Sequence, residues 1–141
     1  MRAALALALS LAASTALAAD RGGIVNWPAT ELAWERTPEG VTFAPLIGDR
    51  FVEPYMAMVR LPAGLVSPAH SKSAEMFGLV VEGVMTHRLA EAASVAEVDL
   101  PAGSLYRIPA GLAHVSSCVS TVDCVTFLYQ DGAFDFVPVA P

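Results

Sequence analysis

The chain carries little positive charge. Lys72 is its only lysine, and Lys and Arg together number 8 against 14 Asp and Glu, which gives a formal net charge of −6 at pH 7. Proteins that bind nucleic acid need basic patches to neutralise phosphates, so nucleic acid is excluded as an expected partner. Helical periodicity is also nearly absent after the first residues, which argues against a helical fold.

Cysteine is scarce as well, because Cys118 and Cys124 are the only two. Residues 119–123 separate them and have the composition of a hairpin loop. In an exported protein this spacing predicts a disulfide across the two flanking strands. The alternative is a pair of buried free thiols, or one thiol near a functional site. Spacing leaves both open, because a disulfide also needs facing Cβ atoms.

A long apolar run occurs at the N-terminus. Residues 1–18 combine a basic Arg2, an apolar stretch, and small residues at Ala16 and Ala18. This pattern predicts a signal peptide that is cleaved after Ala18. A membrane anchor is the alternative, but the run is shorter than the roughly 20 residues of a spanning helix, and no second such run follows. We therefore expect an exported protein, periplasmic or secreted, with no membrane association after cleavage.

The rest of the chain has the pattern of a single all-β domain. Strand-like segments recur between Gly, Pro and Asp turn signals, which is typical of a sandwich or barrel. Residues 89–98 have some helical character but lie between strands, so a loop or an edge strand is preferred. Residues 127–136 contain an Asp-Gly turn signal and predict a closing hairpin. The predicted strand segments are 40–47, 54–61, 76–83, 84–89, 104–110, 124–130 and 134–139.

Strand alternation predicts where two groups of polar side chains point. Within residues 84–89, His87 shares a face with Met85, and the residues on either side of His87 face the other way. His87 is therefore expected to point into the interior. His70 and Lys72 are two residues apart, so both are expected to face the same side of their strand.

Two spaced motifs carry a family resemblance. Residues 64–83 follow the pattern G-x5-H-x-H-x(3,4)-E-x6-G, with Lys72 at the position of the second histidine. Residues 103–118 follow G-x5-P-x-G-x2-H-x3-N, with Cys118 in place of the asparagine. The second match is specific, because four fixed positions fall at the required spacing. The chain therefore resembles the cupin superfamily over residues 41–136, and is similar to a subgroup of unassigned function.

The resemblance implies a fold and a site. The expected fold class is all-β, a small antiparallel double-sheet (jelly-roll) cupin barrel whose mouth usually holds one divalent metal. In cupins the ligands are two histidines and a carboxylate or glutamine from the first motif and one histidine from the second. The expected organisation is a signal peptide at 1–18, an N-terminal extension or edge segment at 19–40, and the barrel at 41–141.

Carried over residue by residue, only part of that ligand set is present. His70 and His114 keep their ligand positions, but Lys72 replaces the second histidine, and a protonated lysine has no lone pair for a metal. Met76 stands at the usual carboxylate position when the distance to Gly83 is held fixed, and a thioether is a poor ligand for Mn, Fe(II) or Zn. The ordinary four-ligand site is therefore incomplete.

His87 offers a replacement ligand. It is predicted to face inward, and the similar cupin subgroup also has a histidine after the segment that corresponds to residues 78–83. We therefore expect His70, His87 and His114, all three histidines of the chain, to bind a divalent ion such as Zn, Mn, Fe or Ni with open coordination positions. The alternative is that these histidines are ordinary surface or core residues.

Four further side chains are candidates near this site. Lys72 is either salt-bridged, with Glu75 as the partner, or a cavity cation that binds an anion or acts as acid, base or nucleophile. Glu75 is a candidate general acid/base, or a metal ligand if its strand is shifted by one residue. Tyr106 is expected to face inward in preference to Arg107 and, with Met76, to contact a bound group, although a core aromatic is the alternative.

Two functions follow from these residues. The first is an exported metal-binding cupin that holds a small organic ligand, with Lys72 and Glu75 as catalytic residues. The second is a non-catalytic module that has lost the metal and binds or senses a small molecule or anion. Fold resemblance does not select a reaction. Homodimers are a further expectation, since similar cupins pair and open sheet edges invite association.

Overall fold

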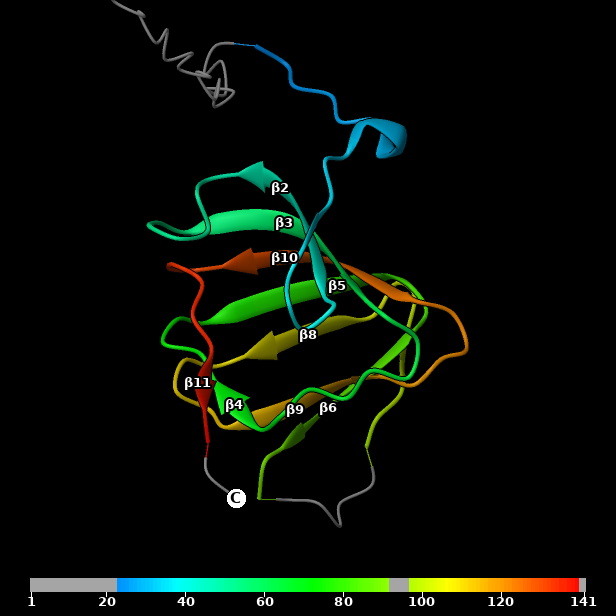
Figure 1. Ribbon diagram of the computed structural model, residues 1–141, viewed down its shortest axis with the longest axis vertical. Coiled ribbons are helices and arrows are strands. Elements are labelled where there is room, and N and C mark those ends of the chain that lie inside the picture. Colours follow the sequence, from blue (N-terminus) through cyan, green and yellow to red (C-terminus); the bar gives the residue numbers. More distant parts are fainter. Residues whose placement is uncertain (1–22, 92–96, 140–141) are drawn as a thin grey trace, which may run out of the picture.

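The computed structural model describes residues 23–91 and 97–139, and strands dominate it (Figure 1). The one helical element in these ranges is a short 3-10 turn, η1 (Ala29–Glu31), and nothing there has the length and apolarity of a membrane-crossing helix. The strands are β1 (Glu35–Arg36), β2 (Thr42–Ile47), β3 (Tyr55–Leu61), β4 (His70–Ser71), β5 (Met76–Glu82), β6 (Val84–Leu89), β7 (Leu100–Pro101), β8 (Leu105–Ile108), β9 (His114–Cys118), β10 (Cys124–Gln130) and β11 (Val137–Pro138).

The strands form two antiparallel sheets that lie face to face (Figure 1). The six-stranded sheet has the order β1-β2-β3-β10-β5-β8, and the five-stranded sheet has the order β11-β4-β9-β6-β7. This confirms the predicted all-β, double-sheet jelly roll. No ladder joins the two sheets within the described ranges, so the jelly roll is not closed into a continuous barrel there.

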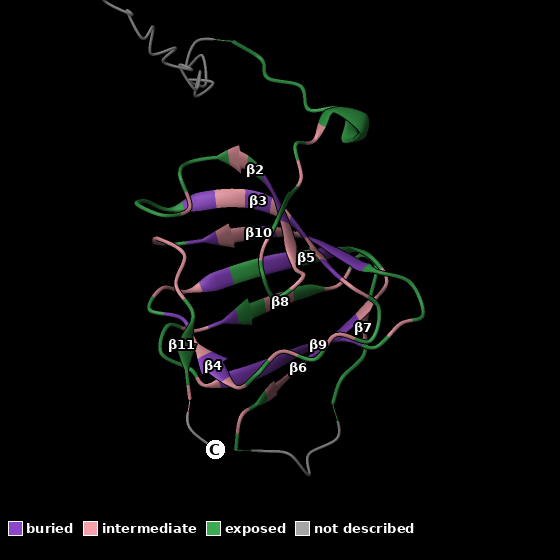
Figure 2. Ribbon diagram, viewed as in Figure 1, coloured by how far each residue is buried: buried purple, intermediate pink, exposed green. Residues whose placement is uncertain are grey.

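The core lies between the sheets, and some of its strands alternate between buried and more exposed residues (Figure 2). Strand β3 shows it most clearly, since Tyr55, Ala57, Val59 and Leu61 are buried and the residues between them are partly exposed. Each large apolar side chain that is removed from water in this way contributes on the order of 1.5–3 kcal/mol. The inner faces of β5, β8 and β10 complete the cluster with Met76, Val80, Ile108, Cys124 and Leu128.

Most of the predicted strand segments are confirmed, but β9 was missed. All five residues of β9 are buried, and residues 65–67 pair along the edge of β9 that does not face β6. The backbone amide of Ser67 donates to the carbonyl of Ser116 (2.9 Å), and the amide of Cys118 donates to the carbonyl of Leu65 (2.9 Å). A serine-rich strand that is buried on both faces shows no alternation of polar and apolar residues, so periodicity does not reveal it.

The predicted disulfide is confirmed, but the predicted hairpin around it is wrong. Cys118 and Cys124 are bonded with a Cα–Cα distance of 5.7 Å, and the alternative of free thiols is excluded. Cys118 ends β9 and Cys124 begins β10, and these strands belong to different sheets. The bond therefore ties the two sheets together at one end of the sandwich instead of closing a hairpin.

The C-terminal tail also crosses between sheets. Residues 127–136 were expected to form a closing hairpin, which is wrong, because β11 pairs with β4 of the five-stranded sheet and not with β10. The chain leaves β10 at Asp131, whose amide donates to the carbonyl of Glu75 (2.9 Å). It then runs across the open end of the sandwich to β11 (Figure 1).

Of the segment 89–98, residues 92–96 lie outside the described residues.

Gly78 makes room for an aromatic ring inside the sandwich. It lies in the middle of β5, opposite Tyr106 of β8, and a Cβ at Gly78 would come within 2.0 Å of the Tyr106 ring. The ring therefore lies across the backbone of β5, and the Tyr106 hydroxyl reaches the Thr126 hydroxyl on β10 at 3.2 Å. Glycine in a strand interior commonly marks such a close approach.

Gly78→Ala should therefore destabilise the fold by roughly 1–3 kcal/mol, because the added methyl overpacks the Tyr106 ring. Denaturant unfolding measures this cost. In a Tyr106→Leu background the same change should cost much less, since the clashing ring is gone and the two effects are coupled. Gly23→Ala, where nothing lies within 4 Å of the added atom, is the neutral control. Equal costs of Gly78→Ala in both backgrounds would contradict this account.

Candidate functional site

The three histidines lie on adjacent strands of the five-stranded sheet. His70 of β4 pairs directly with His114 of β9, and their ring centroids are 4.3 Å apart. His87 of β6 pairs with Ser116, two residues along β9 from His114. Directly paired and alternate residues share a face of a sheet, so all three histidines face the same side. That side is the interior, since Met85 and Cys118 on the same face belong to the core.

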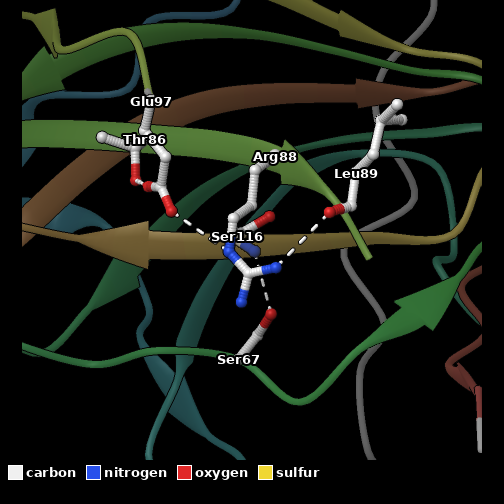
Figure 3. A network of polar contacts seen from close by, with 6 residues as sticks. All are labelled: Ser67, Thr86, Arg88, Leu89, Glu97 and Ser116. Carbon is white, nitrogen blue, oxygen red and sulfur yellow. Dashed lines mark hydrogen bonds and ion pairs between the residues drawn. The ribbon is translucent and has the colours of Figure 1, made fainter. Parts of the chain in front are cut away.

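The opposite face of β6 confirms this orientation. Thr86 and Arg88 point away from the core toward Glu97, which accepts a hydrogen bond from the Thr86 hydroxyl and an ion pair from Arg88 Nε at 3.1 Å (Figure 3). His87 lies between these two residues in the sequence and therefore faces inward. The strand alternation had predicted this direction.

Backbone carbonyls fix the ring orientation of two histidines. The Nδ1 atom of His70 lies 2.9 Å from the carbonyl oxygen of Pro68, and Nδ1 of His114 lies 2.9 Å from that of Leu112. A carbonyl only accepts hydrogen bonds, so each Nδ1 carries the proton and donates it. In a neutral imidazole the lone pair is then on Nε2. The Nε2 atom of His114 is buried and has no hydrogen-bond partner among the described residues.

His87 presents a second unpaired ring nitrogen. Its Nδ1 is 2.9 Å from the Ser116 hydroxyl, and its Nε2 is buried without a hydrogen-bond partner in the described part of the chain. The Tyr106 ring, which comes from the opposite sheet, lies 4.3 Å from the His87 ring between centroids. Tyr106 thus faces the interior, as expected, and packs against the histidine while its hydroxyl bonds Thr126.

Burial keeps all three rings neutral. Desolvation is the largest cause, and it lowers the pKa of His70 and of His87 to about 4 each. Burial likewise lowers the pKa of His114 below its ordinary value. Neutral imidazole is the form that offers a lone pair to a ligand or a metal. These side chains are therefore in the metal-binding protonation state at neutral pH.

Lys72 lies at the edge of the same interior. It is only 6 % exposed, its ammonium donates to the backbone carbonyl of Asp135, and it lies 3.9 Å from the centroid of the Phe134 ring. Burial lowers the pKa of Lys72 to about 8. The alternative of a salt bridge between Lys72 and Glu75 is wrong, since the contacts of the Lys72 ammonium come from the C-terminal segment.

That C-terminal segment covers the histidine pair. The Phe136 ring stacks on the His70 ring at 4.2 Å between centroids, with 15° between the planes. The Asp135 carboxylate accepts a hydrogen bond from the backbone amide of Ser73 at 3.1 Å. Sequence reasoning did not place these residues at the site. The only signal was the alternation of aromatic and acidic residues at 134–136, which predicted a strand and not a cover.

Glu75 and Met76 have other partners in the structure. The Glu75 carboxylate forms a two-point ion pair with Arg107, with distances of 2.5 and 2.9 Å, on the outer side of the β5–β8 pair. Met76 is buried in the core opposite Ile108. The structure therefore gives Glu75 a surface ion pair and Met76 a packing role.

The histidines are near one another but do not form a closed cage. Within residues 23–91 and 97–139, no three His, Cys, Asp or Glu side chains are grouped closely enough to hold a metal as they stand. His70 and His114 form the close pair, and His87 is their diagonal neighbour. A surface hollow of about 350 Å³ lies elsewhere, on the outer face of β5, β8 and β10, with residues such as Phe77, Leu105 and Tyr129 around it.

Solved structures of similar fold include a polyketide cyclase, RemF from Streptomyces resistomycificus (TM-score 0.67, 17 % identity, covering 84 % of this chain and 87 % of that chain). An RmlC-like cupin from Shewanella frigidimarina has a TM-score of 0.58 at 15 % identity, covering 74 % and 87 %. An oxalate oxidase has a TM-score of 0.59 at 19 % identity, covering 85 % and 66 %. At these identities the likeness shows the fold alone.

A family model is more specific than these structures. The ChrR cupin-like domain matches residues 25–134, which is most of the chain and begins within the segment predicted as an N-terminal extension. No match was found among curated proteins. The matched range contains both motifs, all three histidines and both cysteines. The chain therefore belongs to the ChrR cupin-like family of the cupin superfamily.

Proposed function

We propose that this cupin binds a divalent metal ion, such as Zn, Mn, Fe or Ni, through His70, His114 and His87. The observation that carries the proposal is the pair of buried Nε2 atoms, of His87 and His114, that have no hydrogen-bond partner among the described residues. Buried polar atoms are nearly always satisfied, so unpaired ones call for a ligand or a water. Imidazole nitrogen is the commonest protein ligand for such metals.

The surroundings of the histidines fit this role. Metal-binding histidines usually donate their other ring nitrogen to a carbonyl or carboxylate, which fixes the ring, and His70 and His114 do so here. Three imidazoles leave coordination positions open for water or a ligand. Because the three rings are not grouped as a cage, His70 and His114 are the primary ligands and His87 joins them through a side-chain adjustment. Lys72 and Met76 add no ligand.

The side chains around His70 favour a small organic ligand with an anionic group. Lys72 supplies a buried cation next to His70, and Phe134 and Phe136 supply an aromatic wall. At a pKa of about 8, Lys72 also has a share of neutral amine near physiological pH, so it is the candidate acid, base or nucleophile for catalysis. RemF and oxalate oxidase are named for chemistry on small organic molecules, which supports this class by analogy of fold only.

The second candidate function is binding without metal or turnover. Lys72 occupies the position of a cupin ligand, and Met76, at the usual carboxylate position, is packed in the core. Both replacements favour a pocket that senses or sequesters a small anion. Glu75 supports neither candidate as a catalytic group, because its carboxylate is engaged by Arg107 on the outer side.

Export and self-association stay predictions. Residues 1–22, which contain the predicted signal peptide, lie outside the described residues. The apolar hollow on the outer face of β5, β8 and β10, beside the free edge of β8, supports the expected homodimer.

Metal content tests the first function. Protein comprising residues 19–141, purified without chelator or histidine tag and then incubated with Zn, Mn, Fe(II) or Ni, should retain one of these ions near stoichiometry by elemental analysis. His114→Ala should abolish retention, and His87→Ala should lower the affinity by more than the roughly 10–100-fold typical of outer-shell changes. Glu75→Gln is the control and should retain full metal. Equal metal content in wild type and His87→Ala would remove His87 from the ligand set.

Lys72→Met tests the anion pocket. Metal-free protein should bind oxalate, used as a small dicarboxylate probe, at pH 7 by calorimetry, and oxamide, its neutral counterpart, should not bind. Lys72→Met should weaken oxalate binding at least about tenfold, the effect of losing a charge-assisted hydrogen bond. Its stability should be unchanged or higher, because an apolar side chain replaces a buried charge. Retention of full oxalate affinity in Lys72→Met would refute the pocket.

The buried histidines predict how stability depends on pH. Their folded pKa values lie below the unfolded value of 6.5, so the unfolded chain binds protons first as the pH falls. Stability of the metal-free protein should therefore be full above about pH 7 and fall between pH 6.5 and 4, with a loss by pH 5 of roughly 1–2 kcal/mol for each of His70 and His87.

Thermal unfolding at several pH values measures this loss. A His87→Asn variant should show a smaller loss between pH 7 and pH 5 than the wild type, because one of the groups is gone. The same slope in both proteins would show that His87 is not held neutral by burial.

A further inference from the structure

A hollow on the outer face of the six-stranded sheet is lined by two arginines. It has a volume of about 240 Å³ and lies at the β1–β2–β3 end of the sheet. This face points away from the histidines, because the neighbours Phe43 and Val59 on the same strands point into the core. The hollow is lined by Trp34, Arg36, Gly40, Thr42, Arg60, Pro62 and Asp123.

Strand register places three of these residues in one row. Arg36 of β1 pairs with Thr42 of β2, and Thr42 pairs with Arg60 of β3. Directly paired residues share a face, so Thr42 lies between the two guanidinium groups on the same surface. The arginines are two strand spacings apart, which is roughly 10 Å between backbones. Long side chains from both sides can therefore reach one small group above Thr42.

The charges of this row are not balanced within the described residues. Arg50, Arg88 and Arg107 each form an ion pair with a glutamate, whereas Arg36 and Arg60 form none in the described ranges. The carboxylate of Asp123 also lines the hollow, and its Oδ1 accepts a hydrogen bond from the amide of Ala63 at 3.0 Å. Two guanidinium groups against one engaged carboxylate leave the hollow positive in a chain whose net charge is −6.

The Thr42 hydroxyl supplies an independent sign of a missing ligand. Its oxygen is buried and has no hydrogen-bond partner among the described residues. A hydroxyl both donates and accepts, so an oxygen atom that enters the hollow and displaces the side chains packed over this hydroxyl would satisfy it. The position of this orphaned hydroxyl between two arginines selects an anionic oxygen over a cation.

Trp34 orients one of the arginines. The Arg60 guanidinium lies over the Trp34 ring, 4.4 Å from its centroid. Stacking occupies the flat face of a guanidinium and leaves the N–H groups at its edge free to donate in the plane. Those N–H groups match the geometry of a carboxylate or phosphate. Trp34 therefore also serves as a spectroscopic reporter of the site.

We propose that this hollow is a binding site for a small oxyanion, a carboxylate or phosphate group, held between Arg36 and Arg60 with Thr42 donating its hydroxyl. The site lies on the outer face of the sheet and is independent of the proposed metal and ligand pocket. The group recognised is either a free ion or the anionic end of a larger molecule, and the two share the same chemistry.

Trp34 fluorescence tests the proposal in a Trp27→Phe background, where Trp34 is the only tryptophan. Inorganic phosphate and acetate are titrated in separate arms, with sodium chloride added to keep the ionic strength constant. A saturable change in either arm supports the site and identifies the preferred free ion. Saturation by phenyl phosphate or benzoate, at least tenfold tighter than by the free ions, would instead assign the site to the end of a larger molecule.

Matched variants separate the site from general surface charge. Arg36→Gln and Thr42→Val should each weaken the saturable binding at least about tenfold. Arg107→Gln removes the same charge from the far edge of the same sheet and should leave the affinity unchanged. Circular dichroism and the melting temperature verify that each variant is folded, and the oxyanion should raise the melting temperature of wild type but not of Arg36→Gln. If none of the four probes gives a saturable change, the proposal is overturned. Equal affinity in Arg36→Gln and wild type would also overturn it.

Discussion

The pairing of β9 with β4 on one side and with β6 on the other determines where the histidines lie. His114 pairs directly with His70, and Ser116 pairs directly with His87. A shift of one residue in either ladder would turn a histidine to the other face of the sheet, so the whole cluster depends on these two registers. Residues 65–67 hydrogen-bond along one edge of β9, and the disulfide at its end ties it to β10 of the other sheet, so both hold this strand in its place in the five-stranded sheet.

Burial then decides the chemistry of the cluster. The interior position that gives the histidines depressed pKa values also buries the Nε2 atoms of His87 and His114, which have no hydrogen-bond partner among the described residues. The C-terminal segment takes part in this, because Phe136 stacks on His70 and the Asp135 carbonyl accepts from Lys72. Movement of this segment would change solvent access, the histidine pKa values and the Lys72 contact together.

The sequence predicts the direction of a side chain best in strands where inward and outward residues alternate. Much of this arrangement could be predicted in that way. Alternation placed His87 inward, and also one of Tyr106 and Arg107, of which the aromatic residue was the better candidate. The motif spacing gave His70 and the second-motif histidine to one site. The disulfide was predictable from two cysteines in a chain with a predicted signal peptide. Each of these inferences rests on a local sequence pattern, which does not depend on how distant segments of the chain pack.

Other parts depend on contacts between distant residues and leave no local pattern. Strand β9 is polar in sequence yet buried on both faces, and the crossing from β10 to β11 follows from sheet membership and not from the Asp-Gly turn signal. Glu75 pairs with Arg107, thirty-two residues away, because their strands are neighbours in the six-stranded sheet. Lys72 is close to Glu75 in the sequence, but it contacts Asp135 of the C-terminal segment instead, which is also distant in the sequence.

Lys72 and the histidines also constrain each other in the proposed pocket. A divalent cation on the imidazoles would repel the Lys72 ammonium, and an anionic ligand would attract both. Under the proposed function, an anion that binds between them removes the repulsion, so metal and anion each raise the affinity for the other by the same factor. The lysine that replaces a cupin ligand would then make occupancy of the metal site depend on the organic ligand.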